Sequence, residues 1–325
     1  MKTLLRADLR RMFRNPVFYL ALLAAAALVL IIYLQNGRWY ETKMQQYGAF
    51  NGEFYYSADG ALRSGTKEAA LADEFIDLGA VCSGFGLYFS GAVSLLFLAR
   101  EFGGVSVFKL VRGISRTKIF FSAIFVCSFA AALLRVFEFL VFLAVGFFLY
   151  PEELRCFLRM SDFFPRGALI SVLGVAAFNC CAAAVGMCVF RRRTLPVIAA
   201  FLIATYLLSY AVSANSLRVR LEAPEMTYFN TADDSEEADG SAPQYIKPIF
   251  ESDLDLKENP DYVGGANRVF LTVIYDCFSW TQDYQFSYNG FDAPPRQWTF
   301  PLYSAGWILL FSLSGAAVFR RRDLL

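Results

Sequence analysis

The sequence predicts an all-α integral membrane protein with six transmembrane helices, and two observations carry that prediction. Of the 325 residues, 57% are hydrophobic and only 18% are charged, whereas soluble domains carry about 25% charged residues. The apolar residues also fall into long blocks, and a helix needs about 20 of them to cross a bilayer core. Six blocks fit this requirement: residues 17–34, 79–99, 119–150, 167–190, 195–213 and 301–319.

The distribution of Lys and Arg predicts how these helices are oriented. If the N-terminus is inside the cell, the cytoplasmic segments are residues 1–16, 100–118, 191–194 and 320–325. These short segments hold sixteen Lys and Arg but three acids, while the much longer segments on the opposite side hold thirteen Lys and Arg and twenty-five acids. The positive-inside rule therefore places both termini in the cytoplasm. We expect a multi-pass protein of a bacterial plasma membrane.

The first block predicts an uncleaved anchor that follows an amphipathic elbow helix. Its apolar run exceeds the roughly 7–15 residues of a signal-peptide core, and no small-x-small cleavage site follows it. Residues 1–16 separate apolar from basic side chains, as in a helix that lies in the membrane interface; a plain basic anchor is the alternative. The apolar face holds Leu5, Leu9, Met12 and Phe13, and the basic face holds Lys2, Arg6, Arg10 and Arg14.

The blocks divide the chain into four parts. The elbow helix is 1–16, the first five spans are 17–213, an extracytoplasmic loop is 214–300, and the last span with its basic tail is 301–325. Within the second part, 35–78 is an outside loop and 100–118 is a cytoplasmic one. A helical apolar pattern at 266–284 predicts a helix on the outer membrane surface. Cys156 and Cys277 lie in polar loops, and whether they pair stays open.

Composition excludes several classes of function. Histidine is absent, so a Ser-His-Asp triad, a Cys-His dyad and a His-based zinc site are impossible. The acidic run Asp233–Asp239 lacks the alternating order of a calcium loop, and we expect no metal site. A net charge of +1 does not create the positive electrostatic potential that would attract nucleic acid. An intramembrane enzyme is disfavoured as well, since the spans hold no cluster of Ser or acidic residues, and we expect no catalytic residue.

The cytoplasmic loop 100–118 predicts a short surface helix between the second and third spans. Gly103 and Gly104 loosen the backbone before it, and Gly113 can end it in a left-handed cap. Ser115 can cap the following span. A loop that lies on the membrane is the alternative. The helical spacing groups the apolar residues Val107, Leu110, Val111 and Ile114, away from Lys109, Arg112 and Arg116.

Two charged residues interrupt the third block. Arg135 and Glu138 are spaced i, i+3, so they share a helix face and can pair. Each alone at the middle of a bilayer costs about 2.5–3.5 kcal/mol on insertion scales. They either line a water-filled pathway or contact another span, or they form a neutralised pair near the outer leaflet. In the fourth block, small residues predict close helix packing within the bundle, with a subunit interface as the alternative.

Taken in order, several motifs resemble the type 2 permease family of ABC (ATP-binding-cassette) transporters. The opening residues 1–13 are similar to that family's elbow helix, and residues 319–324 are similar to its ending. Residues 259–265, with Arg268 and Tyr275–Asp276, resemble the last outside loop of some members. Gly104–Val105 stands where the family has Gly-Thr. The central motif comprises Glu101, Gly103, Gly104, Leu110, Gly113, Ser115, Arg116 and Ile119.

This resemblance implies a function and a set of partners. Residues 102–114 would match the coupling helix, which sits in a groove of a separate ATPase subunit. The expected coupling residues are Glu101, Gly103, Gly104, Leu110, Arg112, Gly113, Ser115 and Arg116. Because the chain has no Gly-x-x-x-x-Gly-Lys-Ser/Thr loop, ATP and Mg would be bound by that partner. The resemblance therefore implies an exporter built from two permease subunits, identical or different, and two ATPase subunits.

One different kind of function stays open beside the exporter. A non-transporting membrane sensor or immunity protein could bind a peptide through the outside loops 35–78 and 214–300. Such a protein would need no ATPase partner.

Overall fold

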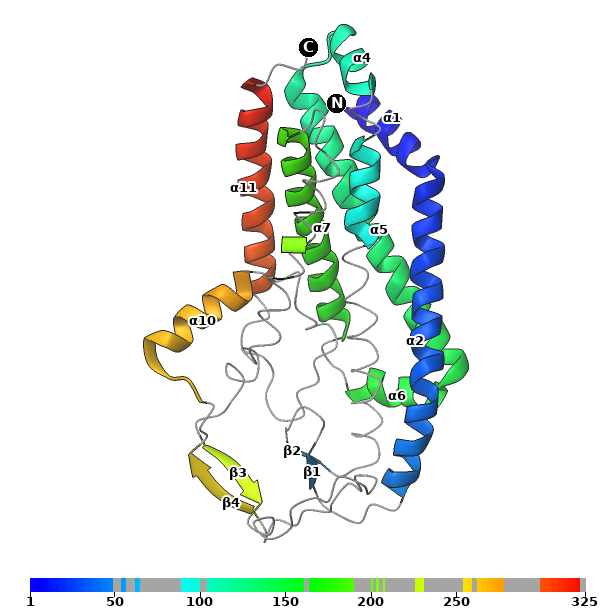
Figure 1. Cartoon of the computed structure of the whole chain (residues 1–325), viewed down its shortest axis with the longest axis vertical. Helices are drawn as coiled ribbons and strands as arrows, with labels where there is room; N and C mark the ends of the chain where they lie inside the picture. The colour runs from blue at the N-terminus through cyan, green and yellow to red at the C-terminus, as the bar shows by residue number, and fades with distance from the viewer. Residues whose placement is uncertain are drawn as a thin grey trace.

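Figure 1 shows the computed structural model of the chain, a bundle of long helices with smaller elements at its two ends. The structure describes residues 1–48, 54–56, 62–64, 89–99, 104–160, 164–189, 200, 203–204, 207, 226–230, 254–258, 262–277 and 299–321. The bundle is formed by α2 (Pro16–Gly48), the helix Phe89–Ala99, α5 (Arg116–Leu149), α7 (Phe164–Val189) and α11 (Thr299–Arg321). Shorter helices are α1 (Lys2–Phe13), α4 (Ser106–Val111), α6 (Pro151–Met160) and α10 (Gly265–Cys277).

Four of these helices are long and apolar enough to cross a membrane: Pro16–Gln35, Arg116–Leu149, Ala168–Cys188 and Pro301–Arg321. They coincide with the first, third, fourth and sixth apolar blocks. In the second block the described helix Phe89–Ala99 is shorter than a span, and most of the fifth block lies outside the described residues. Six spans therefore remain a prediction, of which four are found as helices.

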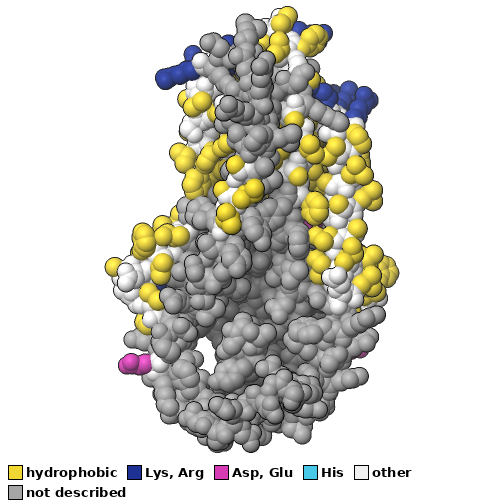
Figure 2. Space-filling view, in the orientation of Figure 1, with side chains coloured by type: hydrophobic (Ala, Val, Ile, Leu, Met, Phe, Trp, Pro, Cys, Tyr) yellow, Lys and Arg dark blue, Asp and Glu magenta, His cyan; other side chains and the backbone are white. Residues whose placement is uncertain are grey.

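The outward faces of the long helices are apolar, which a soluble bundle would avoid. On α2, Leu20, Leu23 and Leu34 are exposed, while Val29 and Tyr33 on the other side are buried. A helix that is hydrophobic all round belongs in a large core or a membrane. Figure 2 shows the same pattern, with hydrophobic side chains along the outside of the helices. This arrangement is consistent with a multi-pass membrane protein.

One end of the bundle collects the basic residues, and we call it the basic end. The N-terminus, α1, α4, the start of α5 and the end of α11 lie there, and α6 and the strands lie at the opposite end (Figure 1). Lys and Arg side chains gather at the basic end in Figure 2. Its exposed basic residues are Lys2, Arg6, Arg10, Arg14, Arg112, Lys118, Arg320 and Arg321. Three of the four segments predicted to share the cytoplasm thus lie together in their described parts, and the fourth, 191–194, lies outside the described residues.

The far end adds two short β-ladders to the helical fold. Strands β1 (Phe54–Tyr56) and β2 (Leu62–Ser64) pair antiparallel, with Phe54 opposite Ser64. Strands β3 (Met226–Asn230) and β4 (Leu254–Glu258) also pair antiparallel, with Tyr228 opposite Leu256. Both ladders fall in segments predicted to lie outside, where the sequence pattern indicated only loops.

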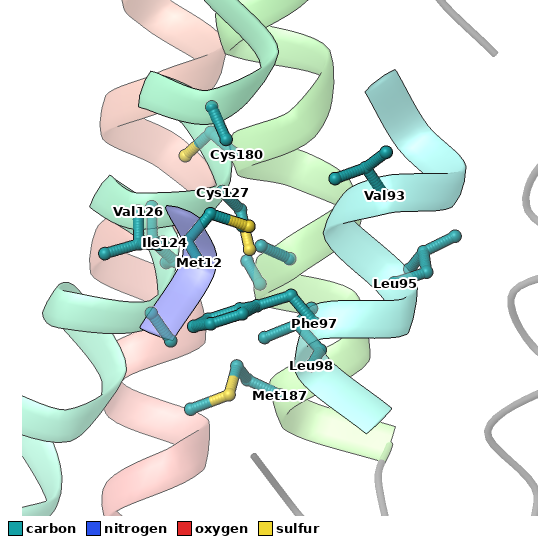
Figure 3. Close-up of a cluster of buried hydrophobic side chains, with 14 of the residues drawn as sticks. Met12, Val93, Leu95, Phe97, Leu98, Ile124, Val126, Cys127, Cys180 and Met187 are labelled. Atoms are coloured by element: carbon teal, nitrogen blue, oxygen red, sulfur yellow. The ribbon is translucent and has the colours of Figure 1, made fainter. Parts of the chain in front are cut away.

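The main core lies toward the basic end and joins segments from the whole chain. Figure 3 shows Met12 of α1 beside side chains of Phe89–Ala99, α5 and α7. Met12, Leu98, Cys127 and Met187 are all fully buried in this cluster. A second core lies around Tyr33 of α2, whose hydroxyl donates a 2.9 Å hydrogen bond to the Phe142 carbonyl of α5. α5 contributes to both clusters and contacts α1, α2, α4, α6, α7 and α11, so it is the central helix of the bundle.

Small residues bring α7 and α11 close together, as the small-residue pattern of the fourth block predicts. Ala183 and Ala184 of α7 are buried in the main core. The Cys188 thiol lies 3.5 Å from the Gly315 carbonyl oxygen of α11. A Cβ on Gly315 would come within 3.2 Å of the Ala184 Cβ. In lipid, such close backbone approach is a main source of helix association.

Candidate functional site

The short helix α4 stands at the basic end between Phe89–Ala99 and α5, and its cap follows the sequence pattern. Gly113 has φ of +76°, the left-handed conformation that favours glycine. The Gly113 N–H donates to the Leu110 carbonyl at 2.8 Å, and the Ile114 N–H donates to the Lys109 carbonyl at 3.1 Å. These two bonds form a Schellman motif. The predicted left-handed cap at Gly113 is confirmed.

The predicted apolar face of α4 is wrong in part. The structure sends Val107, Phe108 and Val111 outward, with Phe108 55% and Val111 78% exposed. Leu110 and Ile114 instead pack inward against the main core. The reason is that the helix ends at Val111, so Ile114 follows the turn rather than the helical spacing. We call the exposed set Val107, Phe108 and Val111 the docking face.

The docking face carries a cation at its edge. The Arg112 guanidinium lies over the Phe108 ring, 4.2 Å from its centroid. Cation–π contacts of this kind contribute about 0.5–1 kcal/mol at exposed sites. The contact keeps the guanidinium beside Phe108, so α4 presents an apolar surface bordered by positive charge.

A buried acid attaches α4 to the elbow helix. Asp8 of α1 is 1% exposed, and its Oδ2 accepts from Lys109 Nζ at 3.0 Å and from Ser122 Oγ of α5 at 2.7 Å. Its Oδ1 accepts from the Arg11 guanidinium. Lys109, which the sequence pattern placed on the polar side of α4, is only 6% exposed. We call Asp8, Arg11, Lys109 and Ser122 the Asp8 anchor.

The elbow helix otherwise matches its predicted faces. Leu5, Leu9 and Phe13 pack against the main core, and the four predicted basic residues are exposed. At its end, the Asn15 side chain accepts from the Val17 N–H at 3.2 Å, and α2 begins at Pro16. Pro16 thus stands at the first helical position of α2, where its missing N–H leaves no hydrogen bond unmade.

The remaining expected coupling residues occupy different places. Gly104 has φ of +132°, which agrees with a loosened backbone before α4, whereas Glu101 and Gly103 lie outside the described residues. Ser115 is at the N-cap position of α5, but its side chain makes no capping hydrogen bond. Arg116 donates from Nη1 to the Arg320 carbonyl at 3.2 Å, which ties the start of α5 to the end of α11.

Arg135 and Glu138 form an ion pair inside the bundle. Arg135 Nη1 lies 2.7 Å from Glu138 Oε2, and both side chains are 3% exposed. Arg135 Nε also donates to Ser171 Oγ of α7 at 2.9 Å, and its guanidinium lies 4.7 Å from the centre of the Phe139 ring. These contacts join α5 to α7 and pair the two charges, so both alternatives left by the sequence stay open.

A second buried polar cluster escaped the sequence analysis. Asn179 of α7 is fully buried; its Nδ2 donates to Ser90 Oγ at 2.9 Å, and its Oδ1 accepts from Ser94 Oγ at 2.7 Å. Ser94 also reaches the Cys127 carbonyl of α5 at 3.5 Å. The cluster connects Phe89–Ala99 with α5 and α7. A lone Asn in an apolar block was its only signal in the sequence.

At the opposite end, α10 leaves the base of α11 obliquely (Figure 1). The helix predicted at 266–284 is present as Gly265–Cys277; its continuation lies outside the described residues. Val269, Phe270 and Val273 are exposed, and Arg268 lies over the Tyr262 ring. The side chains of Cys156 and Cys277 are outside the described part of the structure, so their pairing stays open.

Comparison of the chain with models of protein families, with curated proteins and with solved structures finds no match. The function must therefore be inferred from the chain's own residues.

Proposed function

We propose that this chain is the permease subunit of an ABC exporter, which moves a substrate out of the cell with ATP hydrolysed by a separate subunit. The observation that carries the proposal is α4. It is a short helix between two bundle helices, it lies at the basic end, and it exposes an apolar docking face. Exposed apolar surface with a polar border is typical of a protein interaction site.

The position of α4 suits a helix that transmits force. Its end leads through Gly113 directly into α5, the central helix, which contacts α7 through Arg135 and Ser171. Displacement of α4 by a partner would therefore act on the bundle core. In the proposed cycle, nucleotide binding by the partner favours one of two bundle arrangements, and hydrolysis restores the other.

The chain needs partners for this activity. Its sequence has no phosphate-binding loop of the Walker type, so ATP and Mg would be held by the ATPase subunit. A second permease subunit, identical or different, would complete the translocation path within the lipid bilayer. Arg112 at the edge of the docking face favours a partner groove with acidic residues at its border.

The test is co-purification from the native source at native expression level. The solubilised wild-type protein should bring down an ABC ATPase, identified by mass spectrometry. Val111→Asp places a carboxylate on the docking face and should reduce the recovered ATPase at least about tenfold, since an unpaired charge in a docked apolar interface costs several kcal/mol. The matched control is Val269→Asp on α10, where the native side chain is 65% exposed.

The control separates loss of docking from loss of folding. Val269→Asp should retain the ATPase because α10 lies at the opposite end of the bundle (Figure 1). If the wild-type protein purifies without any ATPase, the exporter proposal fails, and a peptide-binding sensor becomes the better hypothesis.

A further inference from the structure

We propose that Asp8 is the positioning residue that fixes which face of α4 is presented to a partner, so that α1, α4 and the start of α5 move as one unit. The inference rests on the proposed function only in the identity of the partner. The contact between α1 and α4 is a property of this chain alone.

The geometry joins three separate elements at one carboxylate. Asp8 Oδ2 receives Lys109 Nζ of α4 at 3.0 Å and Ser122 Oγ of α5 at 2.7 Å. Asp8 and Lys109 are separated by 101 positions in the chain. Both are buried, and Ser122 is fully buried. No other ion pair among the described residues joins two different helices.

The anchor determines the rotation of α4 about its own axis. Lys109 faces α1, so Val107 and Val111, each about 160° from it around a helix of 3.6 residues per turn, must face away, and Phe108 lies to one side at about 100°. A helix of six residues has little stability of its own. Its orientation therefore depends on the anchor and on the inward packing of Leu110.

The same burial explains why α1 should follow α4. Separating Lys109 from Asp8 would deprive a buried ammonium of its carboxylate, which is unfavourable even though Arg11 still pairs with Asp8, whereas moving Asp8 and Lys109 together leaves their ion pair intact. A force applied to the docking face would reach α1 through Lys109 and Asp8. Because α1 leads into α2 at Pro16, this is a second route into the bundle, separate from the direct link through α5.

The test is hydrogen exchange measured by mass spectrometry on the full-length protein in detergent, with no ATPase present. The readout is the exchange rate of the α4 amides, residues 106–114, compared with that of α7. Asp8→Leu should raise the α4 rate about a hundredfold, because it leaves Lys109 buried without its carboxylate. Lys109→Met should raise the α4 exchange rate less, since Arg11 still pairs with Asp8 and Ser122 still donates a hydrogen bond to it.

The double variant Asp8→Leu with Lys109→Met is the decisive comparison. Removing both charges should lower α4 exchange at least about tenfold from that of Asp8→Leu, since an apolar pair can replace a buried ion pair. Part of the rise should remain, because the buried Ser122 hydroxyl has still lost its acceptor. Arg10→Gln is the matched control on α1, because Arg10 is exposed; it should leave α4 unchanged. If Asp8→Leu cannot be purified, Lys109→Met and the double variant carry the comparison.

Two results would overturn the inference. One is that the exchange rate of the α4 amides in both single variants equals that of the wild-type protein. The other is a rise that the double variant does not reverse and that extends equally to α7, which would indicate general loss of stability. Neither result depends on an ATPase. Conversely, α4 exchange in the double variant could fall back from that of Asp8→Leu while the wild-type protein binds no ATPase. That combination would support the role of Asp8 and refute the proposal that the chain is part of an exporter.

Discussion

Gly315 of α11 offers a substitution whose cost can be worked out from the packing around it. An added Cβ would lie 2.6 Å from Phe120 Cζ of α5 and 3.2 Å from the Ala184 Cβ of α7. Carbon atoms in favourable contact are about 3.5–4.0 Å apart, so Gly315→Ala creates an overlap of roughly 1 Å with the Phe120 ring. Either the ring or α11 must move.

The Phe120 ring is poorly able to give way. It is fully buried and packs at 5.6 Å against the Phe319 ring and at 5.7 Å against the Phe121 ring. Overpacking of this kind costs about 1–3 kcal/mol. Against it stands a gain of about 1 kcal/mol from replacing a helical glycine by alanine. The net expectation is a loss of stability of up to about 2 kcal/mol.

Gly306 on the same helix supplies the matched control. A Cβ there would meet nothing within 4 Å, so Gly306→Ala should keep only the helical gain of about 1 kcal/mol. Equilibrium unfolding of the solubilised protein in SDS would measure both variants. We expect Gly315→Ala to be less stable than Gly306→Ala by about 1–3 kcal/mol, and Phe120→Leu to relieve part of the difference. Equal stability of the two alanine variants would refute the packing of α11 against α5 described here.

The two buried polar clusters give the remaining predictions, measured by the same unfolding assay. Glu138→Gln removes the carboxylate from Arg135 and should cost about 3–5 kcal/mol, whereas Glu138→Gln with Arg135→Met should recover most of that loss; a double variant no better than the single one would argue against the ion pair. Asn179→Leu leaves the buried Ser94 hydroxyl without its amide acceptor and should cost about 1–3 kcal/mol. Adding Ser94→Ala should then cost nothing further, and an additive second loss would show that the two side chains do not interact.

Local structure at the basic end could be predicted from neighbouring residues alone. The two faces of α1 follow from a spacing of three and four residues, and its end follows from Asn15–Pro16. The cap of α4 follows from Gly113, because a left-handed cap favours glycine wherever the helix lies. Each of these features depends on residues within one or two turns.

For the Asp8 anchor, the sequence could indicate the buried acid but not its partner. Asp8 lies on the apolar stripe of α1, three residues after Leu5 and four before Met12, so a buried acid could have been expected there. Its partner Lys109 is 101 positions away, and no local pattern connects the two. The same limit applies to Asn179, whose partner Ser90 belongs to a helix 89 positions earlier.

The outer end shows what a hydrophobicity pattern misses. The long third block was expected to end in a polar loop, but Pro151 instead starts α6. Proline at a first helical position was the available signal. The ladder β1–β2 had no comparable signal, since its strands of three residues fall below the roughly 4–8 residues over which alternation is recognised. In the five-residue strand β3 the order Met-Thr-Tyr-Phe-Asn does not alternate strictly between apolar and polar residues.

The claim that α4 is the site of ATPase docking is tested most directly by photo-crosslinking in cells. A benzophenone amino acid would replace Phe108 on the docking face and, as the matched control, Phe270 on α10, which is 65% exposed. We expect that the adduct from position 108 contains an ABC ATPase and that the adduct from position 270 does not. Adducts from position 108 that contain only lipid, at native expression of the protein, would contradict it.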